Sequence, residues 1–239
     1  RRAATRPGAR IPSLRRCRTL SSVLELGLKS LLAYLLGSLM GALLIGRLRG
    51  VDIRRLGSGN AGGTNALRTQ GFGFAAGVVL VDVGKALLAV GWLPAWSIPG
   101  IGVDPELSRE WLAVACAVAV VAGHVWPMYH EFRGGKGAAT LIGALAVLAP
   151  VTLVPVFAVW LAFVMVFGMV GLATMAAAVA VPVALVILER PAPVPELVLA
   201  ILMAGFMVYT HRANIARMRA GNENRVKRLW LLRPRDAGR

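Results

Sequence analysis

The sequence predicts an all-α, polytopic integral membrane protein with about seven transmembrane helices. Hydrophobic residues make up 57% of its 239 residues, the mean hydropathy is +0.67, and only 16% of the residues are charged, against about 25% in soluble domains. Apolar runs of the length that a helix needs to cross a bilayer recur along the chain. The 27 basic residues exceed the 11 acidic ones and lie mostly between these runs, which favours lipid headgroups or a phosphorylated ligand over nucleic acid.

Five apolar runs follow one another along the chain. They occupy residues 23–46, 74–93, 111–131, 138–188 and 196–210. The fourth run would extend roughly 75 Å as one helix, whereas a hydrocarbon core is roughly 30 Å thick, so the chain must turn back within it. We expect turns near Pro150 to Pro155 and near Gly168 to Gly171, with short helices of about 16–18 residues between them.

Three polar segments decide how often the chain crosses the membrane. They are residues 52–73, 123–140 and 211–228. Two spans separate the first from the second, so these lie on one side. If the third segment lies on the same side, the chain between the second and third segments must cross an even number of times. The run 196–210 crosses once, so 138–188 must cross three times, which gives seven spans. Basic residues crowd these segments and the tail, whereas the opposite loops carry only Arg109 and Arg190, so the polar side is predicted to be cytoplasmic.

The N-terminal residues do not fit this arrangement. Residues 1–22 contain seven arginines and no acid, yet seven spans would put them outside. We therefore expect a basic leader that is disordered or not native, then a membrane domain at 23–212 and a basic cytoplasmic tail at 213–239 that completes the site. An even number of spans with the N-terminus inside is the alternative.

The first polar segment has the composition of an anion-binding loop. Residues 57–65 read GSGNAGGTN, and such small residues let backbone N–H groups approach a phosphate and form a concave nest. Its expected phosphate-binding residues are Gly57, Ser58, Gly59, Asn60, Gly62, Thr64 and Asn65. Arg68 lies one helical turn after Thr64, near the start of the second span, and its guanidinium group can bind a phosphate through two N–H donors. A flexible loop with a capping Asn or Thr is the alternative.

The other two segments add further polar groups. Residues 134–137 read GGKG, which is not a Walker A loop because Gly137 stands where that motif has Ser or Thr. After the last span, His211 and Asn214 are three residues apart and should share a helix face, whereas we expect Arg217 to act only as a headgroup anchor. The candidate site residues of these segments are His124, Gly134, Gly135, Lys136, Gly137, Thr140, His211, Asn214 and Glu223.

Two ionisable residues, Asp82 and Lys85, fall inside the second span. Charges at such depth are costly and are usually paired or functional. Their i,i+3 spacing predicts a structural ion pair, with lining of the site as the alternative. The cysteines, Cys17 and Cys116, show no metal or redox spacing, and we expect neither a metal nor a cofactor.

Taken together, these motifs resemble the PlsY-type acyl-phosphate:glycerol-3-phosphate acyltransferases of bacterial inner membranes. The similar parts are GSGNAGGTNALR at 57–68, VDVGK at 81–85, GHVWPMYHEFRGGKGAAT at 123–140 and HRANIARMRAGNEN at 211–224. The resemblance covers about residues 25–228, and it departs at Gly63, where the family more often has alanine, and in the variable region around Glu223. It implies seven spans and an active site open to the cytoplasm.

The resemblance also implies a reaction. A fatty acyl group passes from acyl phosphate to the sn-1 hydroxyl of glycerol 3-phosphate, which gives lysophosphatidic acid and phosphate in the first step of phospholipid synthesis. The residues expected to be catalytic are Ser58, Arg68, Lys136, His211 and Asn214. The proton acceptor is left open between the substrate phosphate and His124 or His211. We expect a monomer in the lipid bilayer.

A membrane transporter of phosphate or phosphate esters would use similar basic groups. The polar loops, however, cluster on one side of the predicted topology, and no inverted repeat is evident.

Overall fold

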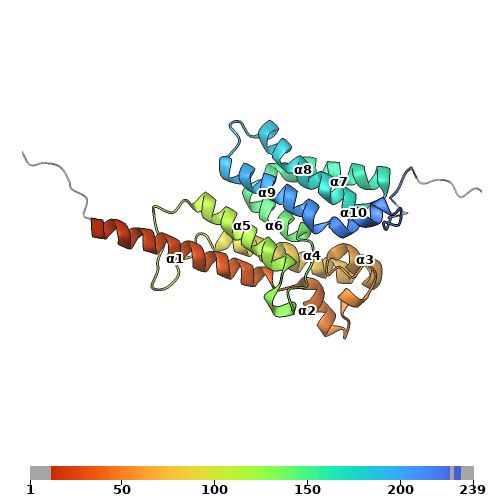
Figure 1. The fold of residues 1–239 in the computed structure, drawn as a ribbon, viewed down its shortest axis with the longest axis horizontal. Coiled ribbons are helices and arrows are strands. Elements are labelled where there is room, and N and C mark those ends of the chain that lie inside the picture. The colour runs from red at the N-terminus through yellow and green to blue at the C-terminus, as the bar shows by residue number, and fades with distance from the viewer. Residues whose placement is uncertain (1–11, 227–228, 233–239) are drawn as a thin grey trace, which may run out of the picture.

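The computed structural model describes residues 12–226 and 229–232, with side chains from residue 21 onward, and every regular element in this part of the chain is a helix. The α-helices are α1 (Pro12–Gly37), α2 (Gly41–Leu48), α3 (Gly63–Gln70), α4 (Phe72–Leu87), α5 (Arg109–Val125), α6 (Ala138–Leu148), α7 (Leu153–Phe167), α8 (Val170–Leu188), α9 (Val194–Thr210) and α10 (Arg212–Arg219). Shorter elements are the 3-10 turns η1 (Ile53–Arg55), η3 (Met128–His130) and η4 (Pro150–Thr152), and the π-helical turn η2 (Leu88–Trp92). Figure 1 shows the long helices running along the longest axis, with α3 and α10 near one end and the start of α1 at the other.

Four helical stretches are long and apolar enough to cross a membrane: Phe72–Trp92, Arg109–His130, Pro150–Phe167 and Val170–Leu188. Two bent pairs, α1 with α2 at 43° and α9 with α10 at 52°, raise the number to as many as six if each pair is one span. The predicted all-helical class is confirmed, while the count of seven spans stays a prediction.

The run 138–188 divides into three helices at the predicted places. Pro150 opens η4 between α6 and α7, and Gly168, with φ of +72°, ends α7 in the left-handed conformation that glycine adopts most readily. The helix α6 has only 11 residues, which is shorter than expected for a span.

The helix α1 begins at Pro12 and runs unbroken past residue 22, so residues 12–22 are helical and not disordered. The expected domain boundary at residue 22 stays a prediction. Residues 1–11 of the expected leader lie outside the described residues.

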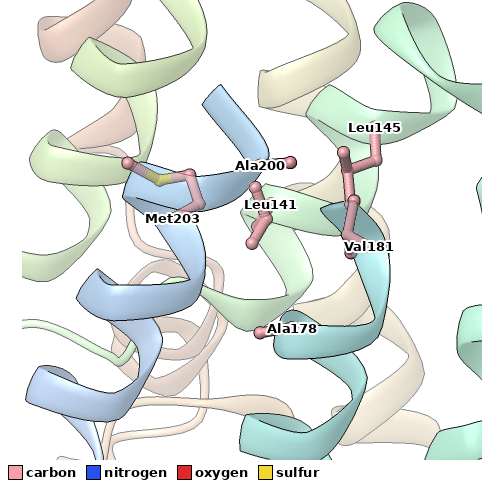
Figure 2. A pocket seen from close by; sticks show the side chains of 6 residues that line it. All are labelled: Leu141, Leu145, Ala178, Val181, Ala200 and Met203. Atoms are coloured by element: carbon pink, nitrogen blue, oxygen red, sulfur yellow. The ribbon is translucent and has the colours of Figure 1, made fainter. Parts of the chain in front are cut away.

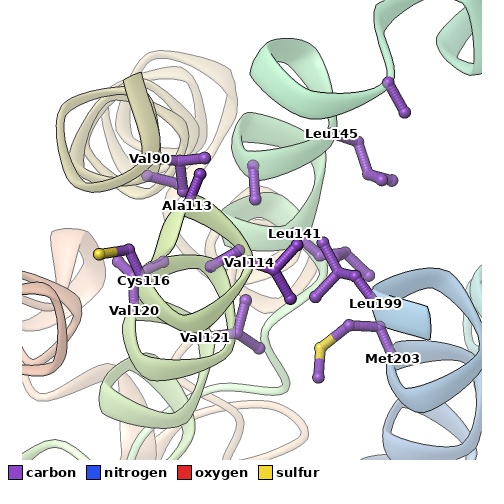
Figure 3. Close-up of a cluster of buried hydrophobic side chains, with 14 of the residues drawn as sticks. Val90, Ala113, Val114, Cys116, Val120, Val121, Leu141, Leu145, Leu199 and Met203 are labelled. Atoms are coloured by element: carbon purple, nitrogen blue, oxygen red, sulfur yellow. The ribbon is translucent and has the colours of Figure 1, made fainter. Parts of the chain in front are cut away.

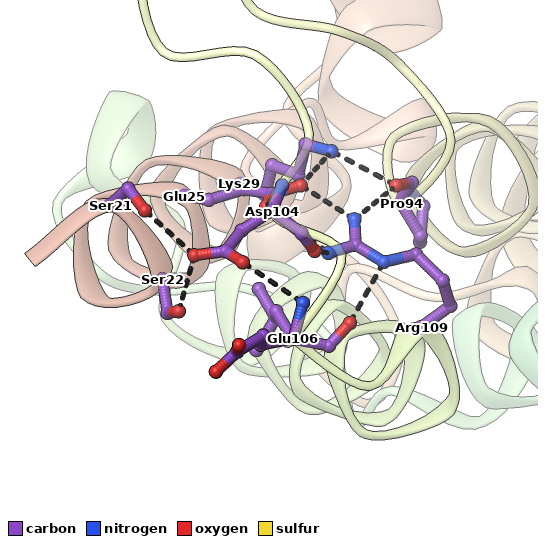
Figure 4. A network of polar contacts seen from close by, with 9 residues as sticks. Ser21, Ser22, Glu25, Lys29, Pro94, Asp104, Glu106 and Arg109 are labelled. Atoms are coloured by element: carbon purple, nitrogen blue, oxygen red, sulfur yellow. Dashed lines mark hydrogen bonds and ion pairs between the residues drawn. The ribbon is translucent and has the colours of Figure 1, made fainter. Parts of the chain in front are cut away.

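A polar network fixes the N-terminal half of α1 to the loop before α5 (Figure 4). The carboxylate of Glu25 accepts hydrogen bonds from Lys29 Nζ at 2.7 Å and Arg109 Nη1 at 2.6 Å. The hydroxyls of Ser21 and Ser22 donate to Asp104 Oδ2 at 2.7 and 2.6 Å. These contacts neutralise the buried carboxylate of Glu25, which lies outside the three polar segments.

The apolar core lies between α4, α5, α6, α8 and α9 and is built largely from alanine, valine and leucine (Figure 3). A small pocket within it is lined only by apolar side chains of α6, α8 and α9, namely Leu141, Leu145, Ala178, Val181, Ala200 and Met203 (Figure 2). The helix α7 is apolar throughout, yet Val164 is its one buried residue, as expected for a helix that faces lipid.

Candidate active site

The turn that carries Lys136 folds back onto the end of α5. The backbone N–H of Gly135 donates to His124 O at 3.1 Å. A Cβ at Gly134 would lie 2.1 Å from His124 O, and one at Gly135 would lie 2.2 Å from His124 Nε2. Gly137 has φ of +88° and is the N-cap of α6. Only glycine therefore fits this turn, which places the lysine at the entrance to α6.

A chain of polar contacts joins Lys136 to the segment after the last apolar helix. Lys136 Nζ donates to Asn214 Oδ1, and Asn214 Nδ2 donates to Glu223 Oε1 at 2.6 Å. The other oxygen of that carboxylate, Oε2, accepts from Arg217 Nε at 2.7 Å. Arg217 thus has a specific role within this chain of contacts, beyond the simple anchoring expected from the sequence.

The surroundings of Lys136 lower the pKa of its ammonium group to about 8. Burial is the largest cause, and the positive charge of Arg217 acts in the same direction, as does that of Arg68. The carboxylate of Glu223 opposes them by favouring the charged form. The charges of Arg217 on α10 and Arg68 on α3 therefore both act on Lys136, with Arg217 acting more strongly.

His211 lies at the bend between α9 and α10. Its Nδ1 is 2.7 Å from Met207 O, and because a carbonyl oxygen only accepts, this contact requires the proton on Nδ1. Nε2 is then the nitrogen that can accept a proton or a hydrogen bond. Nearby, α8 packs so closely that a Cβ at Gly171 would lie 2.6 Å from Asn214 Nδ2. The need for glycine at this position was not evident from the sequence.

The first polar segment folds around Asn65. Ser58 N donates to Asn65 Oδ1 at 2.9 Å, and Asn65 Nδ2 donates to Leu56 O at 2.9 Å. Gly57 and Gly59 have φ of +57° and +73°, the left-handed conformation that a concave loop requires. The polar atoms of the Asn65 side chain, which were expected to bind phosphate, are therefore hydrogen-bonded within the loop and hold its shape.

The remaining candidates differ in exposure. Asn60 and Gly62 are partly exposed, and Gly62 is the N-cap of α3. Thr64 and Arg68 are exposed on α3. Thr140 is 0% exposed, and its Oγ1 has no hydrogen-bond partner among the described residues, so it lies beneath the surface of the site.

The predicted ion pair of Asp82 and Lys85 is confirmed, with 3.0 Å between Oδ1 and Nζ, and it has a third member. Lys85 Nζ lies 2.9 Å from His124 Nδ1, and the histidine is only 2% exposed. The pair also supplies hydrogen-bond partners to backbone groups at the break between α1 and α2. Lys85 Nζ donates to Gly37 O at 2.8 Å, and Gly41 N donates to Asp82 Oδ1 at 3.3 Å.

The three polar segments meet at one end of the helical bundle (Figure 1). Arg54 Nη1 of the first segment donates to His130 O of the second at 3.4 Å. Lys136 of the second segment donates to Asn214 of the third. The second polar segment therefore contacts both of the others.

Several known proteins are similar to this chain. A family described as glycerol-3-phosphate acyltransferase matches residues 28–221. The glycerol-3-phosphate acyltransferase of Synechococcus elongatus is 42% identical over 199 residues, which cover 82% of this chain and 92% of that protein. That of Halalkalibacterium halodurans is 36% identical over 199 residues, which cover 82% and 93%.

Solved structures are similar as well. The crystal structure of PlsY (YgiH), an integral membrane glycerol 3-phosphate acyltransferase, in its glycerol 3-phosphate form superposes with a TM-score of 0.71 at 32% identity, covering 84% of this chain and 94% of that one. Its lysophosphatidic acid form superposes with a TM-score of 0.69 over the same shares.

Proposed function

The chain belongs to the glycerol-3-phosphate acyltransferase family, and we propose that it takes its acyl group from an acyl phosphate. It is an integral membrane enzyme that transfers an acyl group to glycerol 3-phosphate and forms lysophosphatidic acid. The observation that carries the proposal on the donor is that two groups of anion-binding residues adjoin: the left-handed glycine loop with Arg68 on α3, and Lys136 with Asn214. Arg54 of the first polar segment contacts the second, and the charge of Arg68 acts on Lys136. Two such groups suit two phosphates, whereas an acyl thioester carries no phosphate at its reacting carbonyl.

The site residues divide the binding of the two substrates between them. We assign the acyl phosphate to the loop around Ser58, with its left-handed glycines, and to Arg68. Glycerol 3-phosphate is assigned to Lys136, His211 and Asn214. Glu223 orients the amide of Asn214. His124, Asn65 and Thr140 are assigned supporting roles, because their side chains are buried.

The chemical step forms an ester bond and breaks a mixed anhydride. The sn-1 hydroxyl oxygen attacks the acyl carbon, the bond from that carbon to the phosphate oxygen breaks, and inorganic phosphate leaves. The hydroxyl proton passes to substrate phosphate, whose second pKa is near 6, or to Nε2 of His211. Backbone N–H groups of the Ser58 loop stabilise the oxyanion that forms. Because phosphate is a good leaving group, alignment and charge stabilisation supply most of the catalysis.

We propose that the site and the C-terminus face the cytoplasm of a bacterial inner membrane, with the enzyme acting as a monomer. The support for this orientation is the basic character of the three polar segments, whereas the opposite loops carry only Arg109 and Arg190. Reporter fusions at the C-terminus test the orientation, and a periplasmic signal there would contradict it. Light scattering of the purified protein tests the monomeric state, which a dimer mass would refute.

A donor comparison tests the reaction. The purified enzyme is incubated with glycerol 3-phosphate and either an acyl phosphate or the acyl-CoA of the same chain length. We expect one phosphate released per lysophosphatidic acid formed from acyl phosphate, and no product from acyl-CoA. Product from acyl-CoA alone would refute the proposed donor.

A further inference from the structure

The segment after α10 lies against the end of α7. Four of its donors reach four consecutive carbonyls there: Val226 N to Gly168 O at 2.8 Å, Leu231 N to Met165 O at 2.8 Å, Trp230 Nε1 to Val166 O at 2.9 Å, and Arg225 Nη1 to Phe167 O at 3.1 Å. A helix leaves its last carbonyls without partners within the helix. The described residues of this segment, 222–226 and 229–232, therefore cap α7 from a distant part of the chain.

Two side chains hold the segment in this place. The ring of Trp230 packs on Gly168, where a Cβ would lie 3.0 Å from Trp230 Cγ. The guanidinium carbon of Arg225 lies 4.3 Å from the centroid of the same ring, a cation–π contact. The positive charge of Arg225 also lies at a helix C-terminus, where the helix dipole favours a cation.

The capping segment is continuous with the catalytic chain of contacts. Glu223 stands two residues before Arg225, and its carboxylate accepts from Asn214 Nδ2 at 2.6 Å and from Arg217 Nε at 2.7 Å. Asn214 in turn accepts from Lys136 Nζ. Once the segment is fixed on α7, the backbone at Glu223 has little freedom to move away from Asn214.

We propose that Arg225 and Trp230 are positioning residues of the acyltransferase site. By fixing the segment on the end of α7, they hold Glu223 against Asn214 and so fix the ammonium group of Lys136 where it meets phosphate. This inference rests on the proposed role of Lys136 in binding phosphate. It adds a requirement at two residues without proposed substrate contacts: Arg225 in the third polar segment and Trp230 beyond it.

The test compares purified full-length variants. Trp230→Ala and Arg225→Gln remove the anchor, and Leu232→Ala is the matched control because this neighbouring side chain is 67% exposed. We expect the KM for glycerol 3-phosphate to rise about fivefold to tenfold in the two anchor variants, with a smaller change in kcat, and to stay unchanged in the control. Trp230→Phe keeps the ring on Arg225 and should restore most of the affinity.

A pH profile separates positioning from loss of folded protein. Lys136 is faced by Arg68 from α3, by Arg217 and Glu223 from α10 and the tail, and by His211. When Glu223 is freed, its support for the charged ammonium weakens, so the alkaline midpoint of kcat/KM should move to lower pH in Trp230→Ala. A reduced amount of folded enzyme lowers kcat but leaves this midpoint in place.

The outcomes distinguish this inference from the function it rests on. An unchanged KM and midpoint in Trp230→Ala and Arg225→Gln would overturn the positioning role. If Lys136→Ala retained normal KM, the phosphate-binding role of the lysine itself would be wrong. Should Trp230→Ala fail to fold, as judged by its thermal unfolding in detergent, Arg225→Gln serves as the anchor-loss variant, with Trp230→Phe and Leu232→Ala as its controls.

Discussion

The charge of Lys136 should set the upper pH limit of the enzyme. Its pKa is lowered from 10.5 to about 8, first by burial and then by the nearby positive charge of Arg217. The group is therefore charged below pH 8 and loses its proton as the pH rises through 8, not near 10.5. The second pKa of a phosphate ester is near 6, so glycerol 3-phosphate stays a dianion throughout this range and the lysine alone changes charge.

The size of the effect follows from this pKa. A lysine with a pKa of about 8 is about nine-tenths charged at pH 7 and about one-tenth charged at pH 9. If only the charged form binds phosphate, kcat/KM for glycerol 3-phosphate should fall about tenfold between these two values. The assay measures initial rates of lysophosphatidic acid formation at subsaturating glycerol 3-phosphate, because kcat/KM reports the protonation of the free enzyme.

Lys136→Arg is the control for this prediction. Arginine keeps its charge at every pH of the assay, so any activity that remains in this variant should show no decline between pH 7 and pH 9. A flat profile in the natural enzyme would refute the reasoning, and so would the same decline in Lys136→Arg, since another group would then be responsible.

Three further changes test other parts of the site. Arg68→Ala should lower kcat/KM by about tenfold to a hundredfold through loss of a charged phosphate contact, with unchanged thermal unfolding because the residue is exposed; near-normal activity would contradict its assignment. Gly135→Ala forces a Cβ to within 2.2 Å of His124 Nε2 and should raise the KM for glycerol 3-phosphate, whereas Gly73→Ala, whose Cβ meets nothing within 4 Å, should not. Lys85→Met leaves its buried partner charge uncompensated and should lower the free energy of unfolding by about 3–5 kcal/mol, measured by unfolding in detergent; an unchanged value would show that the ion pair is dispensable.

Local chemistry made part of the fold predictable. Proline lacks an N–H and glycine tolerates positive φ, so the turns near Pro150 and Gly168 could be located from the residues alone. The break between α1 and α2 could not. Residues 38–40 contain no proline, and the groups that stabilise the break come from Asp82 and Lys85, more than 40 positions away along the chain.

The sequence predicted which residue types the candidate site contains, but not which partners their side chains contact. The sequence showed that Lys136 and Asn214 carry suitable groups, and the structure joins them directly. The sequence also showed that the Asn65 side chain carries hydrogen-bond donors. It did not show that these donors bind the backbone of the loop itself, at Leu56 O. The role of Trp230 had no local signal, because its carbonyl partner lies 64 residues earlier in the chain.

The buried ionic cluster explains how an irregular site can be built at the edge of an apolar bundle. An Asp82–Lys85 pair alone would be a costly feature at that depth, since removing charge from water is barely offset by pairing. Here the two side chains also bond the unpaired backbone groups at the break after α1, which would otherwise be unsatisfied in lipid. Lys85 further contacts His124, whose carbonyl and ring confine the turn at Gly135. The same buried charges therefore stabilise the broken helix and support the turn that presents Lys136, the proposed phosphate-binding lysine. Their loss should reduce phosphate binding even though both side chains are buried.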